Sequence, residues 1–427
     1  EKALEYFASL EAEDQTVAAR LRQSKALYQI GDVYFELGQF GAARESFQLS
    51  LNQARRLAAE NPSDLDRLFE LSQAEFWVAF AAWYGGDLLV AETHFQLYHD
   101  TAWTLHQREP ENPDWIMEVF WADNNLGSLA FRNRKYEEAR AYFEDAIARI
   151  DPLIDQGSSP ERRLEKSATL SWLGSTHYRL GDLQLSRQAF ERALAMELDP
   201  ADATHQEERA FQLGKLARVE WYLGERDSAL ACALEGVRIA ERLHRSDPAS
   251  MERLYAYAIQ RFYALSFSSG AVGTDQYSEL IELIRTLLST DSPPTEWYSL
   301  AAQAAATGAN QKDPAAISWG NELLDSNATY EALLNGEQHH LLELATAITQ
   351  HDPSRDQRTR SLMEDTADVF QQSADFGLAL PLLRAYHLFG EQDRAREIMN
   401  LMTGKGWRHP ELDSLIEWRP GKTGASE

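Results

Sequence analysis

Residues 27–47 read LYQIGDVYFELGQFGAARESF, and the same pattern returns three more times along the chain. Residues 75–95 read EFWVAFAAWYGGDLLVAETHF, residues 123–143 read DNNLGSLAFRNRKYEEARAYF, and residues 170–190 read LSWLGSTHYRLGDLQLSRQAF. Each copy ends in a phenylalanine, and the successive spacings are 48, 48 and 47 residues, between Phe47, Phe95, Phe143 and Phe190. A fixed period of this length predicts a repeat architecture.

Each copy reads as two amphipathic helices joined by a tight turn. Apolar residues recur at helical spacing on both sides of the turn, and the turn itself holds Gly38, Gly86 or Gly181, with Arg134 in the glycine position once. No stretch shows the sustained period-two alternation of a half-buried strand, so we expect no substantial sheet. The sequence predicts an all-α fold of antiparallel helix pairs.

Small residues occupy one phase of each helix, as Gly31 and Gly127 do in the first helix and Ala43 in the second. They predict close backbone approach, with the terminal phenylalanine filling the space beside the next pair. One helix pair alone would leave its apolar face exposed to water, and stacking of successive pairs buries that face. Five Asx-Pro or Ser-Pro pairs predict where new helix pairs begin, because they combine a side-chain cap with a proline suited to the first turn; they start at Asn61, Asn112, Ser159, Asp199 and Asp247.

The first copy matches a known helix-turn-helix pattern, W-x2-L-G-x2-Y followed by A-x3-F. The matching residues are Leu27, which replaces the tryptophan, and Ile30, Gly31, Tyr34, Gly38, Ala43 and Phe47. The chain therefore resembles the tetratricopeptide repeat family. The resemblance implies a right-handed α-solenoid whose first helices face a concave groove that holds peptides. The family period is about 34 residues, so the longer period here implies second helices extended by about three turns.

The repeats predict four regions in the chain. We expect an N-terminal helix and linker at 1–14, extended repeats at 15–270, divergent helical repeats or a cap at 271–418, and a disordered tail at 419–427. Residues 381–402 recover a helix pair, with Gly390 in the turn. Long, loosely matching repeats resemble the C-terminal repeat regions of multidomain bacterial signalling proteins. That resemblance implies a cytoplasmic location, or a periplasmic one if a membrane anchor precedes the chain.

A weaker fifth copy keeps Ala217, Gly224 and Ala229 in register. In each of the five copies, one aromatic residue stands four positions after the Gly31-type residue. In the family that the chain resembles, this position faces the groove, where rigid aromatic rings can anchor apolar side chains. The alternative is packing between helices. Neighbouring polar or aromatic residues extend the candidate surface, and its arginines suit a carboxylate or peptide backbone. The predicted partner-binding residues are Phe35, Trp83, Tyr84, Asn124, Phe131, Arg132, Tyr178, Arg179 and Trp221.

Composition narrows the partner classes. The chain has 41 Lys and Arg against 67 Asp and Glu, a net charge of −26, which repels nucleic acid phosphates and anionic lipid headgroups. The longest apolar run, residues 76–84, is far shorter than the roughly 20 residues needed to span a bilayer. A single cysteine, Cys232, excludes an internal disulfide. We expect a neutral or basic protein or peptide as partner, no nucleic acid and no direct membrane insertion.

The sequence shows no motif of an enzyme or cofactor site, and we predict neither. His339, His340 and Glu343 could share a metal on one helix face, but no second cluster completes the ligand set, and an exposed polar helix is the favoured interpretation. Catalysis would require the segment after residue 271 to fold back over the groove and close a pocket. Two other functions remain alternatives to partner binding: self-assembly into a homo-oligomer, and sensing of a small ligand.

Overall fold

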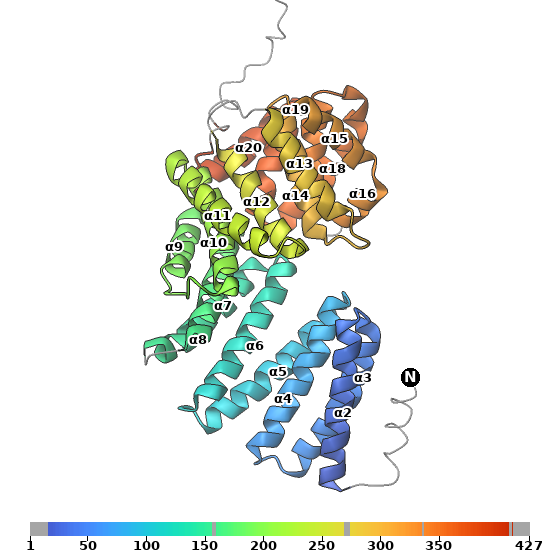
Figure 1. Cartoon of the computed structure of the whole chain (residues 1–427), viewed down its shortest axis with the longest axis vertical. Coiled ribbons are helices and arrows are strands. Elements are labelled where there is room, and N and C mark those ends of the chain that lie inside the picture. The colour runs from blue at the N-terminus through green and yellow to red at the C-terminus, as the bar shows by residue number, and fades with distance from the viewer. Residues whose placement is uncertain (1–15, 156–158, 269–273, 335–336, 410–411, 413–427) are drawn as a thin grey trace, which may run out of the picture. The chain divides into compact units, whose positions relative to one another are not determined.

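The computed structural model describes residues 16–155, 159–268, 274–334, 337–409 and 412. Within these ranges the chain forms α-helices and short 3-10 turns, with no strands, as the sequence predicted (Figure 1). The predicted N-terminal helix at 1–14 and tail at 419–427 lie outside the described residues. None of the described helices is both long enough and apolar enough to traverse a bilayer.

The chain divides into two compact units, the first ending at Arg162 and the second starting at Arg163. In the first unit, consecutive helices pack side by side as antiparallel pairs (Figure 1). Its helices are α2 (Val17–Glu36), α3 (Phe40–Glu60), α4 (Leu65–Tyr84), α5 (Leu88–Arg108), α6 (Pro113–Arg132) and α7 (Tyr136–Asp155).

The second unit continues the alternation with α8, which starts at the boundary, and then becomes less regular. Its first part holds α8 (Pro160–Arg179), α9 (Leu183–Leu194), α10 (Ala203–Tyr222), α11 (Arg226–Ser246), α12 (Met251–Phe267) and α13 (Thr274–Leu288). Shorter helices follow: α14 (Thr295–Asn310), α15 (Pro314–Asp325), α16 (Asn327–Leu334), α17 (Gln338–Thr349), α18 (Asp356–Ser373), α19 (Ala379–Phe389) and α20 (Gln392–Gly404), with 3-10 turns η2 (Pro353–Arg355) and η3 (Phe376–Leu378). The helix pair predicted at 381–402 is confirmed by α19 and α20, and Gly390 ends α19.

In the first five pairs, from α2 and α3 to α10 and α11, the turn that ends the first helix holds one residue of positive φ. Gly38 has φ 70°, and the backbone N–H of Gln39 then reaches the carbonyl of Tyr34 at 2.9 Å, a bond that closes the helix end. Arg134 adopts φ 59° in the third pair, and Lys135 makes the equivalent bond to Ala130. The arginine therefore keeps the turn geometry at the cost of a left-handed backbone that glycine adopts more easily.

Two of the five predicted helix starts are confirmed. Asn112 caps α6 and Pro113 is its first residue, and Ser159 accepts a bond from the backbone of Arg162 in α8. The other three starts are wrong by three residues. There the proline is the second residue of a turn, and the helix begins after a second cap, because the fixed φ of proline suits both positions. The caps used are Asp64, Asp202 and Ser250.

In the first three repeats the extra length is shared by both helices, which corrects the prediction that only the second helix is extended. The first helices α2, α4 and α6 each have 20 residues, and α3 and α5 have 21. A helix of 20 residues already exceeds half of a repeat of about 34 residues. Both helices therefore add area to the face that the pair presents to its neighbours.

The glycines in the first helices lie directly against the phenylalanine that ends the same repeat. A Cβ atom placed on Gly31 would come within 2.5 Å of the Phe47 ring, and one on Gly127 within 2.7 Å of the Phe143 ring. Phe47 also packs against Trp77 of the next pair, with ring centroids 5.6 Å apart. The absent side chain thus makes room for a ring that joins two successive pairs.

Candidate binding pocket

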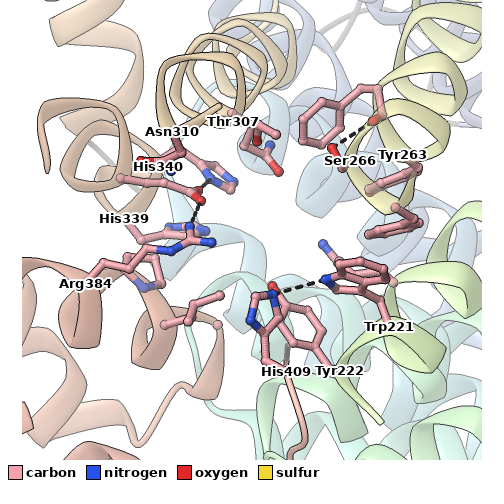
Figure 2. A pocket seen from close by; sticks show the side chains of 18 of the residues that line it. Trp221, Tyr222, Tyr263, Ser266, Thr307, Asn310, His339, His340, Arg384 and His409 are labelled. Carbon is pink, nitrogen blue, oxygen red and sulfur yellow. Dashed lines mark hydrogen bonds and ion pairs between the residues drawn. The ribbon is translucent and has the colours of Figure 1, made fainter. Parts of the chain in front are cut away.

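A cavity of about 270 Å³ lies inside the second unit (Figure 2). Most of its walls come from the first helices of successive pairs, α8, α10, α12, α14, α17 and α19, and His409 adds to the lining. These first helices therefore surround one space.

One border of the cavity forms where the end of the chain returns to the start of the unit. Arg179 at the end of α8 donates two bonds of 3.2 Å to the carboxylate of Asp375, which is fully buried. The indole N–H of Trp407 donates to the Gly181 carbonyl at 3.1 Å, and the Arg408 backbone N–H donates to the Tyr222 carbonyl at 2.7 Å. Residues 405–409, which we name the closing segment, thus complete a ring of helices.

One wall is aromatic. Trp221 stacks on Phe267 with ring centroids 5.0 Å apart and donates its indole N–H to Nε2 of His409 at 3.1 Å. Tyr222 lies beside it, and burial raises the pKa of its hydroxyl well above the ordinary value. Figure 2 shows Trp221, Tyr222 and Tyr263 on one side of the cavity and His340, His339 and Arg384 on the other.

Arg218 is a cation without a carboxylate partner among the described residues. Its guanidinium lies over the ring of Tyr178, 4.4 Å from the centroid, and its buried Nε has no hydrogen-bond partner in the described chain. Arg179 also lines the cavity, but Asp375 already binds it. A charge that is removed from water without a partner is costly. Arg218 is the arginine of this pocket that no carboxylate of the described chain neutralises.

The opposite wall holds a paired carboxylate. Arg384 forms an ion pair with Glu343, and Nδ1 of His340 lies 3.7 Å from the other oxygen of that carboxylate. Burial opposes the charge on Glu343, but the nearby His340 and Arg384 outweigh it, and the pKa of Glu343 is lowered. The negative charge of this wall is therefore balanced by the positive charge of Arg384.

The helix that carries these histidines is not the exposed polar helix that the sequence favoured. In α17, His339 is buried with 4% of its surface exposed, and the helix buries Leu341, Leu342 and Leu344 as well. The prediction was wrong because the sequence alone did not show that α14 and α19 both pack against this helix. Both histidines consequently line the pocket.

Three of the predicted partner-binding residues belong to this pocket. Tyr178, Arg179 and Trp221 line it together, although Tyr178 is only 6% exposed. Sequence analysis missed Arg218, Arg384 and His409. Arg218 stands three residues before Trp221, on the same face of one helix, so this signal was available. Arg384 lies in the last predicted helix pair and His409 follows it, and only the return of the chain places them here.

The other six predicted residues lie in the first unit. Phe35 packs against Phe80 of the next pair and against Tyr84, with ring centroids 5.2 Å apart in both cases. Trp83 packs against Phe95, and Phe131 against Tyr136. Tyr84 is 54% exposed, Arg132 is exposed, and Asn124 donates to the Phe120 carbonyl of its own helix. Partner binding by these residues stays a prediction.

The fold defines the class of protein: an all-α helical-repeat solenoid whose helices pack in consecutive pairs. Models of the tetratricopeptide repeat match residues 24–56 and 168–200, and a second such model matches residues 124–150. The chain therefore contains tetratricopeptide-type repeats at these residues. Proteins of this kind serve in general as interaction scaffolds and are generally non-catalytic.

Solved structures with similar folds include the apo form of RapI, with 12% sequence identity and a TM-score of 0.50, covering 75% of this chain and 98% of RapI. BtubC from P. vanneervenii has 20% identity and a TM-score of 0.45, covering 57% of this chain and 89% of its own. A tetratricopeptide repeat protein from Parabacteroides merdae has 14% identity and a TM-score of 0.37, with coverages of 73% and 98%. No curated protein sequence matches the chain significantly.

Proposed function

We propose that the chain is a protein-interaction module that holds part of a peptide in the pocket of the second unit. An acidic group of the peptide binds Arg218, and an apolar side chain packs on Trp221 and Tyr222. The observation that carries this proposal is the guanidinium of Arg218, which lines the pocket and lacks a carboxylate partner among the described residues.

The local charge supports an anionic group even though the chain is acidic overall. Arg179, Arg218 and Arg384 line the pocket, and the carboxylates bound to them are those of Asp375 and Glu343. Three positive charges against two leave one positive charge, while the whole chain has a net charge of −26. A peptide that is neutral or basic overall and ends in a carboxylate satisfies both the pocket and the acidic surface.

The size of the pocket limits what can enter. Its 270 Å³ lies just below the roughly 300–1,000 Å³ of sites that take drug-sized ligands. One or two residues of a peptide therefore occupy the cavity, and the remainder lies outside it. The same small size favours a second candidate, a small anionic metabolite with an apolar part, which would make the unit a sensor.

Selection from a random peptide library, followed by fluorescence anisotropy on the selected peptides, tests the proposal. Charge-assisted hydrogen bonds contribute about 1.5–3 kcal/mol, so Arg218→Gln is expected to weaken binding about 10–100-fold. Trp221→Ala should also weaken it. Arg238→Gln, an arginine on α11 that does not line the pocket, serves as the matched control.

The outcomes separate the candidates. Equal affinity of the wild type and Arg218→Gln for every selected peptide would overturn the proposed role of the pocket. A loss caused instead by Trp83→Ala and Phe131→Ala would move the site to the aromatic residues of the first unit. Self-assembly is tested by light scattering, and a mass that rises with concentration would support it.

A further inference from the structure

Three side chains at the start of α17 bring their ligand atoms together. Nε2 of His339 lies 3.4 Å from Oε2 of Glu337, and Nε2 of His340 lies 3.6 Å from the same oxygen. The three ligand atoms lie within 4.8 Å of one another, and the two imidazole rings have centroids 3.9 Å apart. Two nitrogens therefore converge on one carboxylate oxygen.

These separations are too long for ordinary hydrogen bonds, which bring nitrogen and oxygen to about 2.7–3.2 Å. They are close to the spacing that a shared metal ion imposes. Zinc bonds to histidine nitrogen and carboxylate oxygen are about 2.0–2.1 Å long, and a tetrahedral arrangement places such ligand atoms about 3.3 Å apart. The observed 3.4 and 3.6 Å thus leave room for one ion between the groups.

The groups behind His340 have the arrangement that orients a metal-binding histidine. Nδ1 of His340 faces Oε2 of Glu343 at 3.7 Å, while its Nε2 faces Glu337. Glu343 is in turn held by Arg384. Histidine ligands of metals commonly donate their second ring N–H to a carboxylate, which fixes the tautomer and leaves the first nitrogen free to coordinate.

We infer that Glu337, His339 and His340 form a binding site for a divalent transition metal of the zinc class. Two imidazoles and one carboxylate are ligands that zinc accepts, and three protein ligands leave a fourth position open. Both histidines line the pocket, so a ligand in the pocket can supply that fourth group. The sequence suggested Glu343 as the carboxylate ligand, and the geometry replaces it with Glu337. Zinc binding does not depend on the proposed peptide function.

The test uses tag-free full-length protein and zinc alone. Equilibrium dialysis with elemental analysis is expected to show one zinc per chain, and zinc should raise the melting temperature. Loss of an outer carboxylate that orients a ligand weakens metal binding about 10–100-fold, so Glu343→Gln should fall in that range. Glu337→Gln and His340→Ala each remove a ligand of the metal itself, so each should weaken zinc binding by at least about 100-fold.

His244→Ala is the matched control, because His244 is a partly exposed histidine of the same unit on α11 and does not line the pocket. It should bind zinc like the wild type. Zinc binding that is equally strong in Glu337→Gln and His340→Ala, or no binding by the wild type, would overturn the inference.

A second measurement needs no variant. The wild-type protein loaded with Co²⁺ should show the intense visible absorption of a four-coordinate site, because coordination geometry is diagnostic of the ligand set. The weak spectrum of octahedral Co²⁺ would contradict the site. Peptide affinity measured with and without zinc then separates the two proposals, because metal binding can fail while Arg218-dependent peptide binding persists.

Discussion

The guanidinium of Arg179 lies 3.2 Å from both carboxylate oxygens of Asp375, a residue 196 positions later in the chain. Asp375 is fully buried and also accepts the backbone N–H of Gly377 at 2.9 Å. A Cβ on Gly377 would come within 2.2 Å of Nη1 of Arg179, so the glycine permits the approach. This pair joins the last part of the second unit to its first helix.

Removing Arg179 should therefore destabilise the second unit strongly. Breaking a buried ion pair by deleting one partner costs about 3–5 kcal/mol, and Arg179→Ala should lie toward the lower end because its side chain keeps 18% exposure. Urea unfolding followed by circular dichroism measures the loss. Arg44→Ala breaks the more exposed pair with Asp87 and should cost at most about 1 kcal/mol. Equal losses in the two variants would show that burial of Asp375 is not decisive.

The closing segment should be required for both stability and binding. Trp407 is 2% exposed, packs on Tyr222 with centroids 4.8 Å apart, and donates to the Gly181 carbonyl. Trp407→Ala should destabilise the second unit by about 3–5 kcal/mol and weaken binding of any ligand that enters the pocket. Trp121, which is 38% exposed in the first unit, gives the control variant Trp121→Ala. Thermal unfolding of both variants checks this prediction.

The glycine and phenylalanine of one repeat should behave as a coupled pair. Gly127→Ala places a methyl group against the Phe143 ring, and overpacking of this kind costs about 1–3 kcal/mol. Phe143→Leu in the same chain should recover part of the loss, which a double-mutant cycle detects as a non-additive term. Gly41→Ala in α3 is the control, because nothing lies within 4 Å of its added Cβ; it should stabilise by about 1 kcal/mol or less. Additive effects of the first two changes would contradict the coupling.

The first unit should gain stability below neutral pH from Glu118. This carboxyl is 5% exposed, and burial raises its pKa from 4.5 to about 6, although hydrogen bonds from Tyr98 and Gln73 act in the other direction. The folded state therefore binds the proton more tightly than the unfolded state. The destabilisation is complete above pH 6, shrinks as the pH falls, and is absent below 4.5.

Glu118→Gln should remove this effect and stabilise the first unit at pH 7 by up to about 2 kcal/mol. The difference in unfolding free energy between variant and wild type, measured in urea, should shrink between pH 7 and pH 5, in the direction expected for a folded-state pKa near 6. A difference that stays constant over this range would show that Glu118 does not titrate as described.

Much of the local structure followed from the sequence. The repeat period, the helical spacing of apolar residues and the turn residues at Gly38 and Arg134 gave the helix pairs, because these patterns act over a few residues. The same reasoning misplaced three helix starts, since proline has the same φ in a turn and in a first helical turn. It also assigned the added length to one helix, because a period measures only the sum of both.

For the pocket, too, the sequence predicted some residues and the tertiary structure alone placed the others. From the sequence alone came Tyr178 and Trp221, which share one phase of successive first helices, and Arg179, which follows Tyr178 directly. Only the tertiary structure paired Arg179 with Asp375, left Arg218 without a carboxylate among the described residues, and placed His339 and His340 beside Glu337. Periodicity reports which face of a helix a residue occupies. Which distant helix covers that face depends on how the divergent repeats close the ring, and no local pattern contains that contact.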